Sequence, residues 1–151
     1  MKRLVISFLI SLLAVSAPIT ANAAIPAVTE EEIAEENYQA ELQLLACVVY
    51  AEAGNQDLQG KRLVADVILN RVDDPAYPNS ISEVIYQTGQ FSTVKDGALN
   101  RAYFNVTQDC FDAVTMELGS RLDGTIKYFT AGGYGKYGTP AYQYGGHWFS
   151  R

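Results

Sequence analysis

The sequence is poor in basic side chains and in side chains that bind metals. It has 11 Lys and Arg residues against 17 Asp and Glu residues, a formal net charge of −6, one His and two Cys. Because no basic stripe is available to follow a phosphate backbone, nucleic-acid binding is not expected. A zinc site needs several His, Cys or carboxylate ligands at close spacing, so we also expect no metal site and no cofactor.

Long apolar runs are missing as well, except at the N-terminus. Lys2-Arg3 precedes the apolar run Leu4–Ala17, and Ala21-Asn22-Ala23 has the small-x-small pattern of a cleavage site. Residues 1–23 therefore predict a secretory signal peptide, and the protein is expected to be secreted, with no membrane span after cleavage. A retained anchor is the alternative, although the run is short for a spanning helix and is followed by Pro18.

The rest of the chain divides by charge. Glutamates crowd residues 30–41, and Thr29 with Glu32 forms a capping box that starts a helix. We expect an acidic lead-in segment over residues 24–41, with a solvated Glu-rich face, followed by one folded domain over residues 42–151. We expect this domain to be a monomer.

Apolar periodicity predicts the helices of this domain. The first helix is expected to cover Glu30–Ala53 with interruptions, including a break near Asn37-Tyr38. The second helix is expected to cover Asp57–Val72. A capping box at Ser80 and Glu83 starts a short helix over Ile81–Gln87, and apolar residues at i+4 steps predict another over Val106–Leu118. Residues 88–97 are expected to be irregular.

Strand-forming composition appears only near the C-terminus. Thr125–Thr130 has strand composition, and His147-Trp148-Phe149 is expected to form a short closing strand. The Gly- and Tyr-rich tract Ala131–Gly146 between them is interpreted as an ordered loop, since tyrosines supply stacking faces together with hydroxyl groups. The predicted fold class is α+β, mainly α, with a small C-terminal β and loop element.

The two cysteines, Cys47 and Cys110, both fall in predicted helices. Export permits a disulfide between them. Two small buried hydrophobic side chains are an equally good interpretation.

The strongest candidate for a catalytic group is Glu52. It continues the apolar stripe of Leu45, Val48 and Val49 at helical spacing, and Gly54 ends the helix just beyond it. The carboxylate is thus expected on the core-facing side, at the negative end of the helix dipole. Both effects disfavour its charged form and should raise its pKa, as a general acid requires.

A glycosidase needs a proton donor and a group that stabilises an oxocarbenium-like centre. Glu52 fits the donor, but no second carboxylate is equally well placed, and the other candidates are Asp57, Asp66, Asp73 and Asp96. A mechanism in which Glu52 acts first as acid and then as base, with water or a sugar hydroxyl as nucleophile, would need no second carboxylate. Asp66 and Asp73 share a polar helix face with Arg62 and Asn70, which indicates solvent, salt bridges or one wall of a cleft.

Two other classes of function remain open. Cys110 near a helix N-terminus, together with His147, would be a thiol–imidazole pair acting on an amide, although Cys110 also lies on the apolar row of its helix. A secreted binding module without catalysis would use the Gly/Tyr tract and Trp148 equally well.

Five short segments in a fixed order carry a family resemblance. They are Val49-Tyr50-Ala51-Glu52-Ala53, Val67-Ile68-Leu69-Asn70-Arg71-Val72, Tyr77-Pro78-Asn79-Ser80-Ile81, Val84-Ile85-Tyr86 and Gly89-Gln90-Phe91-Ser92. With the closing segment Tyr128-Phe129-Thr130 and Gly145-Gly146-His147-Trp148-Phe149, the chain resembles the cell-wall hydrolases of the spore cortex-lytic (SleB/CwlJ) type from about Glu41 onward.

This resemblance implies a lysozyme-like catalytic domain that cleaves the glycan strands of peptidoglycan at the cell wall. It implies that Glu52 is the catalytic acid, and that the product is either a hydrolysed end or the 1,6-anhydro end of a lytic transglycosylase. Members are also described as amidases. The residues expected to line the substrate cleft are Tyr50, Gln90, Phe91, Ser92, Tyr128, Thr130, His147 and Trp148. The spore enzymes often carry an N-terminal peptidoglycan-binding domain. The acidic lead-in segment does not resemble such a domain.

Overall fold

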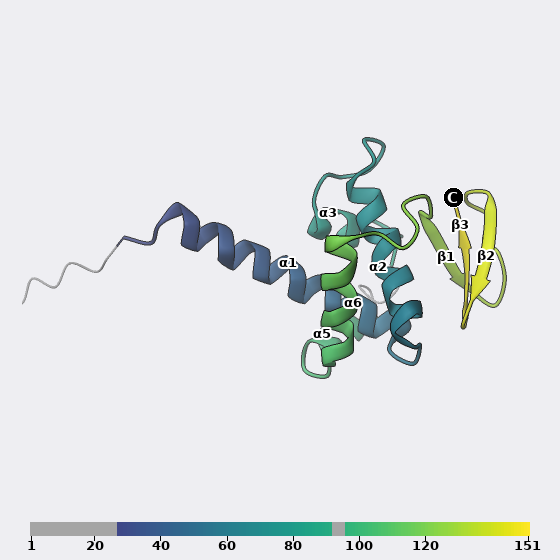
Figure 1. The fold of residues 1–151 in the computed structure, drawn as a ribbon, viewed down its shortest axis with the longest axis horizontal. Helices are drawn as coiled ribbons and strands as arrows, with labels where there is room; N and C mark the ends of the chain where they lie inside the picture. The colour runs from purple at the N-terminus through teal and green to yellow at the C-terminus, as the bar shows by residue number, and fades with distance from the viewer. Residues whose placement is uncertain (1–26, 92–95) are drawn as a thin grey trace, which may run out of the picture.

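A computed structural model describes residues 27–91 and 96–151. Within these residues the order of elements is α1 (Glu30–Ala53), α2 (Leu58–Val72), α3 (Ile81–Tyr86), α5 (Ala98–Tyr103), α6 (Gln108–Gly119), β1 (Tyr128–Ala131), β2 (Pro140–Tyr144) and β3 (His147–Ser150). The helices gather around the C-terminal half of α1, and the small sheet packs at one end of the molecule (Figure 1). The predicted α+β, mainly α, fold is confirmed.

Helix α1 is one continuous helix of 24 residues, and the expected break near Asn37-Tyr38 is absent. Thr29 and Glu32 form the predicted capping box. Residues 30–40 are all exposed, whereas Leu45–Val49 are fully enclosed by the other helices. The N-terminal half of α1 therefore projects as an acidic arm, while its C-terminal half is the centre of the core (Figure 1).

Helix α2 begins after Asp57, whose side chain accepts a hydrogen bond from Gly60 N. The middle of its predicted polar face, Asp66 and Asn70, is buried against α6 and the chain that leads to the sheet. Asn70 donates to the carbonyl oxygens of Asp123 and Ile126 at 2.8 Å each, and Arg62 forms an ion pair with Glu117 of α6. Of the alternatives predicted for this row of polar residues, salt bridges are confirmed, since Arg62 pairs with Glu117 and the exposed Asp73 pairs with Arg121.

Two helices differ from the prediction. The six-residue helix α5 lies in a stretch where no helix was expected, and its N-cap Gly97 makes no side-chain cap hydrogen bond. The last helix begins at Gln108 and not at Val106, since Thr107 is its N-cap. Helix α3 has the predicted start, with the Ser80 hydroxyl accepting from Glu83 N.

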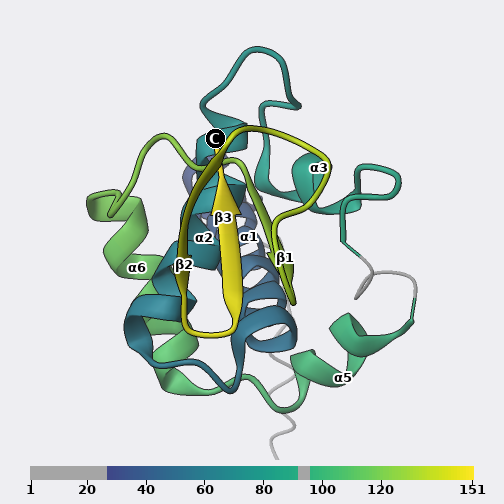
Figure 2. The same cartoon turned by 90° about the vertical axis from the view of Figure 1, so that its right-hand side faces the viewer.

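The sheet has the strand order β1-β3-β2, and both pairings are antiparallel. β1 is shorter than the predicted strand Thr125–Thr130, and β3 forms as expected. β2 lies inside the Gly/Tyr tract, which is therefore part strand and not a loop throughout. In Figure 2 the β1 edge of the sheet faces the side of α3 and α5, and the β2 edge faces the side of α6.

Both cysteines are buried and free in the structure. Cys47 and Cys110 belong to the main core where α1 packs on α6. Of the two interpretations of the sequence, the structure therefore shows two small buried side chains.

No helix within the described residues has the length and apolar character needed to cross a membrane. The predicted signal peptide lies outside those residues.

Candidate active site

Glu52 lies in the last turn of α1, at the point where two cavities meet. One cavity of about 310 Å³ lies on the side of the sheet, and a more open one of about 660 Å³ lies on the side of α5. Glu52 lines both. Its side chain is half-buried, because the apolar stripe that precedes it turns it toward the interior at the helix end.

Among the described residues that line these two cavities, Glu52 is the single acidic one. The four other candidates for a second carboxylate lie elsewhere. Asp57 caps α2, Asp66 is enclosed between α2 and α6, Asp73 pairs with Arg121, and Asp96 accepts from the backbone N–H of Ala98. The arrangement supplies one carboxylic acid and no paired carboxylate.

His147, the first residue of β3, is buried directly behind Glu52. Its ring forms a hydrogen bond with the backbone of Glu52, and it packs edge-to-face on Phe129 at 5.2 Å between ring centroids. Desolvation lowers the pKa of His147, with a smaller opposing effect from the hydrogen bond, so the ring is neutral at physiological pH. Within the described residues Nδ1 is buried without a hydrogen-bond partner.

Arg71, in the last turn of α2, lines the smaller of the two cavities beside Glu52 and also a third, neighbouring cavity. Its Nε donates to Lys127 O at 2.7 Å, and its Nη1 donates to Gln90 Oε1 at 2.8 Å. A guanidinium can only donate, so the amide oxygen of Gln90 faces Arg71 and the Gln90 NH2 group is turned away from it. The Gln90 side chain is thereby fixed as a hydrogen-bond donor at the edge of the cavity.

The neighbouring cavity, of about 340 Å³, extends the site along the sheet. It shares Arg71, Gln90, Phe129 and Thr130 with the smaller cavity beside Glu52. Its far wall is aromatic, with Tyr128, Tyr137 and Trp148. The rings of Tyr128 and Tyr137 are stacked at 6.1 Å between centroids. The three cavities together form one cleft that passes Glu52, and we use the word cleft for them below.

The cleft brings together every predicted site residue that the structure describes. Tyr50 lies on the α5 side, Phe91 and His147 lie beside Glu52, and the rest lie toward the sheet, namely Gln90, Thr130, Tyr128 and Trp148. Ser92 lies outside the described residues. Sequence reasoning missed Arg71 and Phe129, although both stand inside segments that carried the family resemblance.

The proposed pair of Cys110 and His147 is not brought together. Cys110 is buried on α6 beside Thr107, and the contacts of His147 are with Phe129, Phe149 and the backbone of Glu52. In residues 27–91 and 96–151, no group of His, Cys, Asp and Glu side chains is arranged to hold a metal ion.

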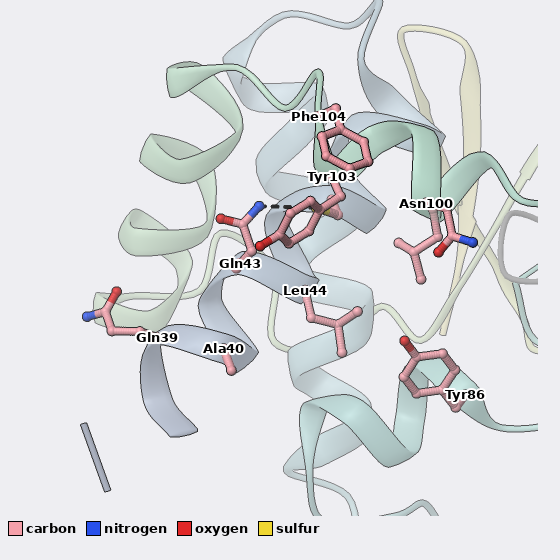
Figure 3. A pocket seen from close by; sticks show the side chains of 10 residues that line it. Gln39, Ala40, Gln43, Leu44, Tyr86, Asn100, Tyr103 and Phe104 are labelled. Atoms are coloured by element: carbon pink, nitrogen blue, oxygen red, sulfur yellow. Dashed lines mark hydrogen bonds between the residues drawn. The ribbon is translucent and has the colours of Figure 1, made fainter. Parts of the chain in front are cut away.

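A further pocket, of about 720 Å³, lies on the other side of α1 and does not include Glu52. Figure 3 shows Leu44 and Gln43 of α1 at its centre, with Tyr103 and Phe104 on one side and Tyr86 on the other. The described residues of its wall include no charged side chain. It offers apolar contact but no group for acid or base chemistry.

The fold and the cleft define a mainly helical, lysozyme-like domain with one acidic group in a groove that also contains aromatic rings. The family model described as Cell Wall Hydrolase matches residues 55–150, well over half of the chain, so the chain belongs to the cell wall hydrolase family. Glu52 lies just before the matched range.

Solved structures and curated proteins agree with this assignment. The catalytic domain of SleB from Bacillus cereus is similar with a TM-score of 0.66 and 28% identity, over 75% of this chain and 91% of that one. The catalytic domain of the germination-specific lytic transglycosylase SleB from Bacillus anthracis has the same TM-score at 27% identity, over 75% and 95% of the two chains.

Among curated proteins, the spore cortex-lytic enzyme of Bacillus subtilis is 41% identical over 59 residues, which is 39% of this chain and 19% of that protein. The enzyme of the same name from Bacillus cereus is 41% identical over 61 residues, 40% of this chain and 24% of that protein. The match thus spans about a fifth of the length of these curated relatives.

Proposed function

We propose that the protein cleaves the glycan strands of peptidoglycan as a lytic transglycosylase, with Glu52 as its single general acid and base. The observation that carries this proposal is the lone carboxylate. Hydrolases that invert or retain configuration generally use a pair of carboxyl groups on either side of the glycosidic bond. The cleft has one, and residues 1–26 and 92–95 contain no Asp or Glu that could supply another.

A single acid suffices when the substrate provides its own nucleophile. Glu52 would first donate its proton to the glycosidic oxygen as the bond from the muramoyl C1 breaks. The resulting carboxylate would then accept the proton of the muramoyl C6 hydroxyl as that oxygen bonds to C1. The product carries a 1,6-anhydro bridge, no water is consumed, and Glu52 ends protonated for the next cycle.

The other predicted residues take binding roles in this proposal. Tyr50 would contact the sugar on the α5 side, and Gln90, Phe91 and Thr130 would contact the sugar whose bond is cleaved. Tyr128 and Trp148 would stack on the next sugar toward the sheet. His147 would hold the backbone of Glu52 in place, and Ser92 is proposed on the family resemblance alone. The relatives named as lytic transglycosylase and spore cortex-lytic enzyme support this choice of substrate.

Mass spectrometry of peptidoglycan digested in H2(18)O by the mature protein tests the proposal. We expect 1,6-anhydro muropeptides that contain no 18O. Hydrolysis would place one 18O at each new reducing end, and release of free stem peptides would indicate an amidase. Binding to the wall without new ends would indicate a binding module.

Glu52→Gln keeps the size of the side chain and removes its proton donor, so we expect no anhydro product from this variant. Glu36→Gln on the exposed arm of α1 is the matched control and should retain full activity. Loss of product in Glu52→Gln supports the role of Glu52 only if this variant unfolds at the same temperature as Glu36→Gln. A Glu52→Gln protein that stays active would refute the role of Glu52.

The N-terminal features complete the proposal. We propose that residues 1–23 are a signal peptide, that residues 24–41 are an acidic lead-in, and that residues 42–151 are the catalytic domain, which acts outside the cytoplasm as a monomer. No ligand cofactor enters this mechanism.

A further inference from the structure

Arg71 is a buried cation without an acidic partner. It is 4% exposed, and its guanidinium is in no ion pair within the described residues. Because residues 1–26 and 92–95 contain no Asp or Glu, those segments offer no partner either. Lys61, which is equally buried, pairs with Asp109 at 2.7 Å, and Arg62 pairs with Glu117.

Three aromatic rings surround Arg71 in place of a carboxylate. Its Cζ lies 5.4 Å from the ring centroid of Tyr77, 5.6 Å from that of Phe91 and 5.3 Å from that of Tyr128. Such contacts offset part of the cost of taking a guanidinium out of water. Desolvation lowers the pKa of Arg71, but an arginine side chain stays charged in proteins.

The polar contacts of Arg71 leave one end of the guanidinium unused. Nε and Nη1 donate to Lys127 O and Gln90 Oε1, and within the described residues Nη2 donates to no group. Arg71 lines both cavities on the sheet side of Glu52. The positive charge therefore borders the same cavity as the carboxyl of Glu52.

The substrate class proposed above carries a matching negative charge. Every second sugar of a peptidoglycan strand has a lactyl ether arm that ends in a carboxyl group. That carboxyl is either free or in amide linkage to an amino acid, which then brings a carboxylate of its own. A guanidinium recognises a carboxylate through charge-assisted, directional hydrogen bonds, which a lysine cannot reproduce in the same geometry.

We propose that Arg71, held in its aromatic cage, is a carboxylate-binding site of the cleft and takes the carboxylate on the side arm of a muramoyl residue. The site selects muramoyl sugars that carry a negative charge over neutral ones. This inference rests on the proposed cleavage of glycan strands. A purely structural Arg71 would hold α2 to β1 and to Gln90 and would show no such selection.

The test compares glycan strands that differ only in the charge of the side arm. One substrate has free lactyl carboxylates, a second has them converted to neutral methylamides, and a third carries a single alanine with a free carboxylate. We measure kcat/KM of the wild-type protein on each, near neutral pH and low salt. We expect a preference of roughly tenfold or more for a carboxylate substrate over the methylamide, the size expected of a charge-assisted pair.

The first and third substrates distinguish the source of the carboxylate. Preference for the first substrate assigns the lactyl group, and preference for the third assigns the attached amino acid. The preference should fall as salt is added, because the ion pair is screened. Equal rates on all three substrates would overturn the proposal while leaving the proposed function intact. A wild-type protein that makes no new ends on any of them would instead refute the proposed function.

Substitutions assign the preference to Arg71. Arg71→Gln should act on the carboxylate and methylamide substrates at equal rates, and Arg71→Lys should retain only part of the preference. If Arg71→Gln slows both substrates by the same factor and keeps the wild-type preference, Arg71 is structural and the proposal fails. Should Arg71→Gln not fold, Arg71→Lys decides, since an unchanged preference in that variant also contradicts carboxylate recognition by the guanidinium.

Discussion

The ring of His147 is hydrogen-bonded to the backbone of Glu52, although the two residues stand at opposite ends of the domain's sequence. His147 begins β3, and Glu52 lies in the last turn of α1. The contact ties the sheet to the helix end that carries the proposed acid. Because burial lowers the pKa of His147, the ring stays neutral and adds no positive charge beside Glu52.

Replacing His147 should change activity through the placement of Glu52. We expect His147→Ala to lower kcat on the order of tenfold, the size of one lost buried hydrogen bond, with a smaller change in KM. His147→Gln can still donate to the Glu52 backbone and should recover much of that loss. The measurement is steady-state kinetics on soluble glycan strands, together with the pH profile of both variants.

The pH profile separates positioning from proton transfer. A positioning residue leaves the limbs of the profile where they are in the wild-type protein. A limb that shifts or disappears in His147→Gln would show that His147 itself exchanges a proton during turnover, contrary to the neutral, buried ring of the structure.

A second prediction concerns Asp66 and Glu117, two enclosed carboxyl groups between α2 and α6. Glu117 accepts hydrogen bonds from Arg62 and from Leu122 N, and Asp66 Oδ2 accepts from Asp123 N at 2.9 Å. Burial, together with a smaller effect of the hydrogen bond with Glu117, raises the pKa of Asp66 to about 8. We infer that Asp66 is protonated in the folded protein and donates to Glu117.

The sign of the pH dependence follows from this raised pKa. An Asp in the unfolded chain ionises near pH 4, so between about pH 4 and pH 8 the folded state holds a proton that the unfolded state has released. The contribution of Asp66 to stability is therefore complete below about pH 4 and is lost as the pH rises through about 8. The melting temperature of the wild-type protein should fall between pH 5 and pH 9.

Asp66→Asn should flatten this dependence, since an amide donates to Glu117 at every pH. We expect the variant to melt at a higher temperature than the wild-type protein at pH 9, by several degrees, and to differ less at pH 5. Asp112→Asn, at an exposed position of α6, is the matched control and should follow the wild-type curve. Parallel curves for wild type and Asp66→Asn would contradict a protonated Asp66.

The position of Glu52 could be predicted from sequence because its signal is local. The stripe Leu45, Val48 and Val49 and the stop at Gly54 lie within one helix, and the helix periodicity alone turns Glu52 toward the interior. The environment of Arg71 has no such local signal. Its cage is assembled from Tyr77, Phe91 and Tyr128, which stand in three separate segments and meet only in the folded chain.

The missed elements have physical reasons of the same kind. Helix α5 is six residues long and lacks a side-chain cap, so neither periodicity nor a start signal is present. Strand β2 begins at Pro140 and has an irregular register between Pro140 and Tyr142, where it pairs with β3. The pairing of β2 depends on its partner strand β3 and not on its own composition. The residues that flank β2 favour turns, so its sequence alone does not indicate a strand.

The third prediction concerns the redox state of the thiols. Burial raises the pKa of Cys47, and both cysteines are enclosed in the core. We expect a thiol reagent to react with neither cysteine in the folded protein and with both after denaturation in the absence of reductant. A mature, secreted sample in which no thiol reacts after denaturation would show that a disulfide forms on export, contrary to the structure.

The last prediction tests how the cleft's aromatic wall is shaped. Gly138 has φ +73°, and a Cβ built on it would clash with the backbone oxygen of Arg151 and would lie 2.6 Å from Cδ2 of Tyr128. Gly132 has a similar φ of +82°, but a Cβ there meets nothing within 4 Å. Both Gly→Ala changes introduce the strain of a left-handed residue, roughly 1–2 kcal/mol, while only Gly138→Ala also displaces a ring.

We therefore expect Gly138→Ala to unfold at lower urea concentration than Gly132→Ala, with a further loss of about 1–3 kcal/mol from the steric clash. It should also raise KM, because the Tyr128 ring both lines the sheet-side cavity and covers Arg71. Gly132→Ala should leave KM unchanged. Equal stabilities and equal KM values for the two variants would mean that Tyr128 moves freely, and that the wall it forms does not determine how substrate binds.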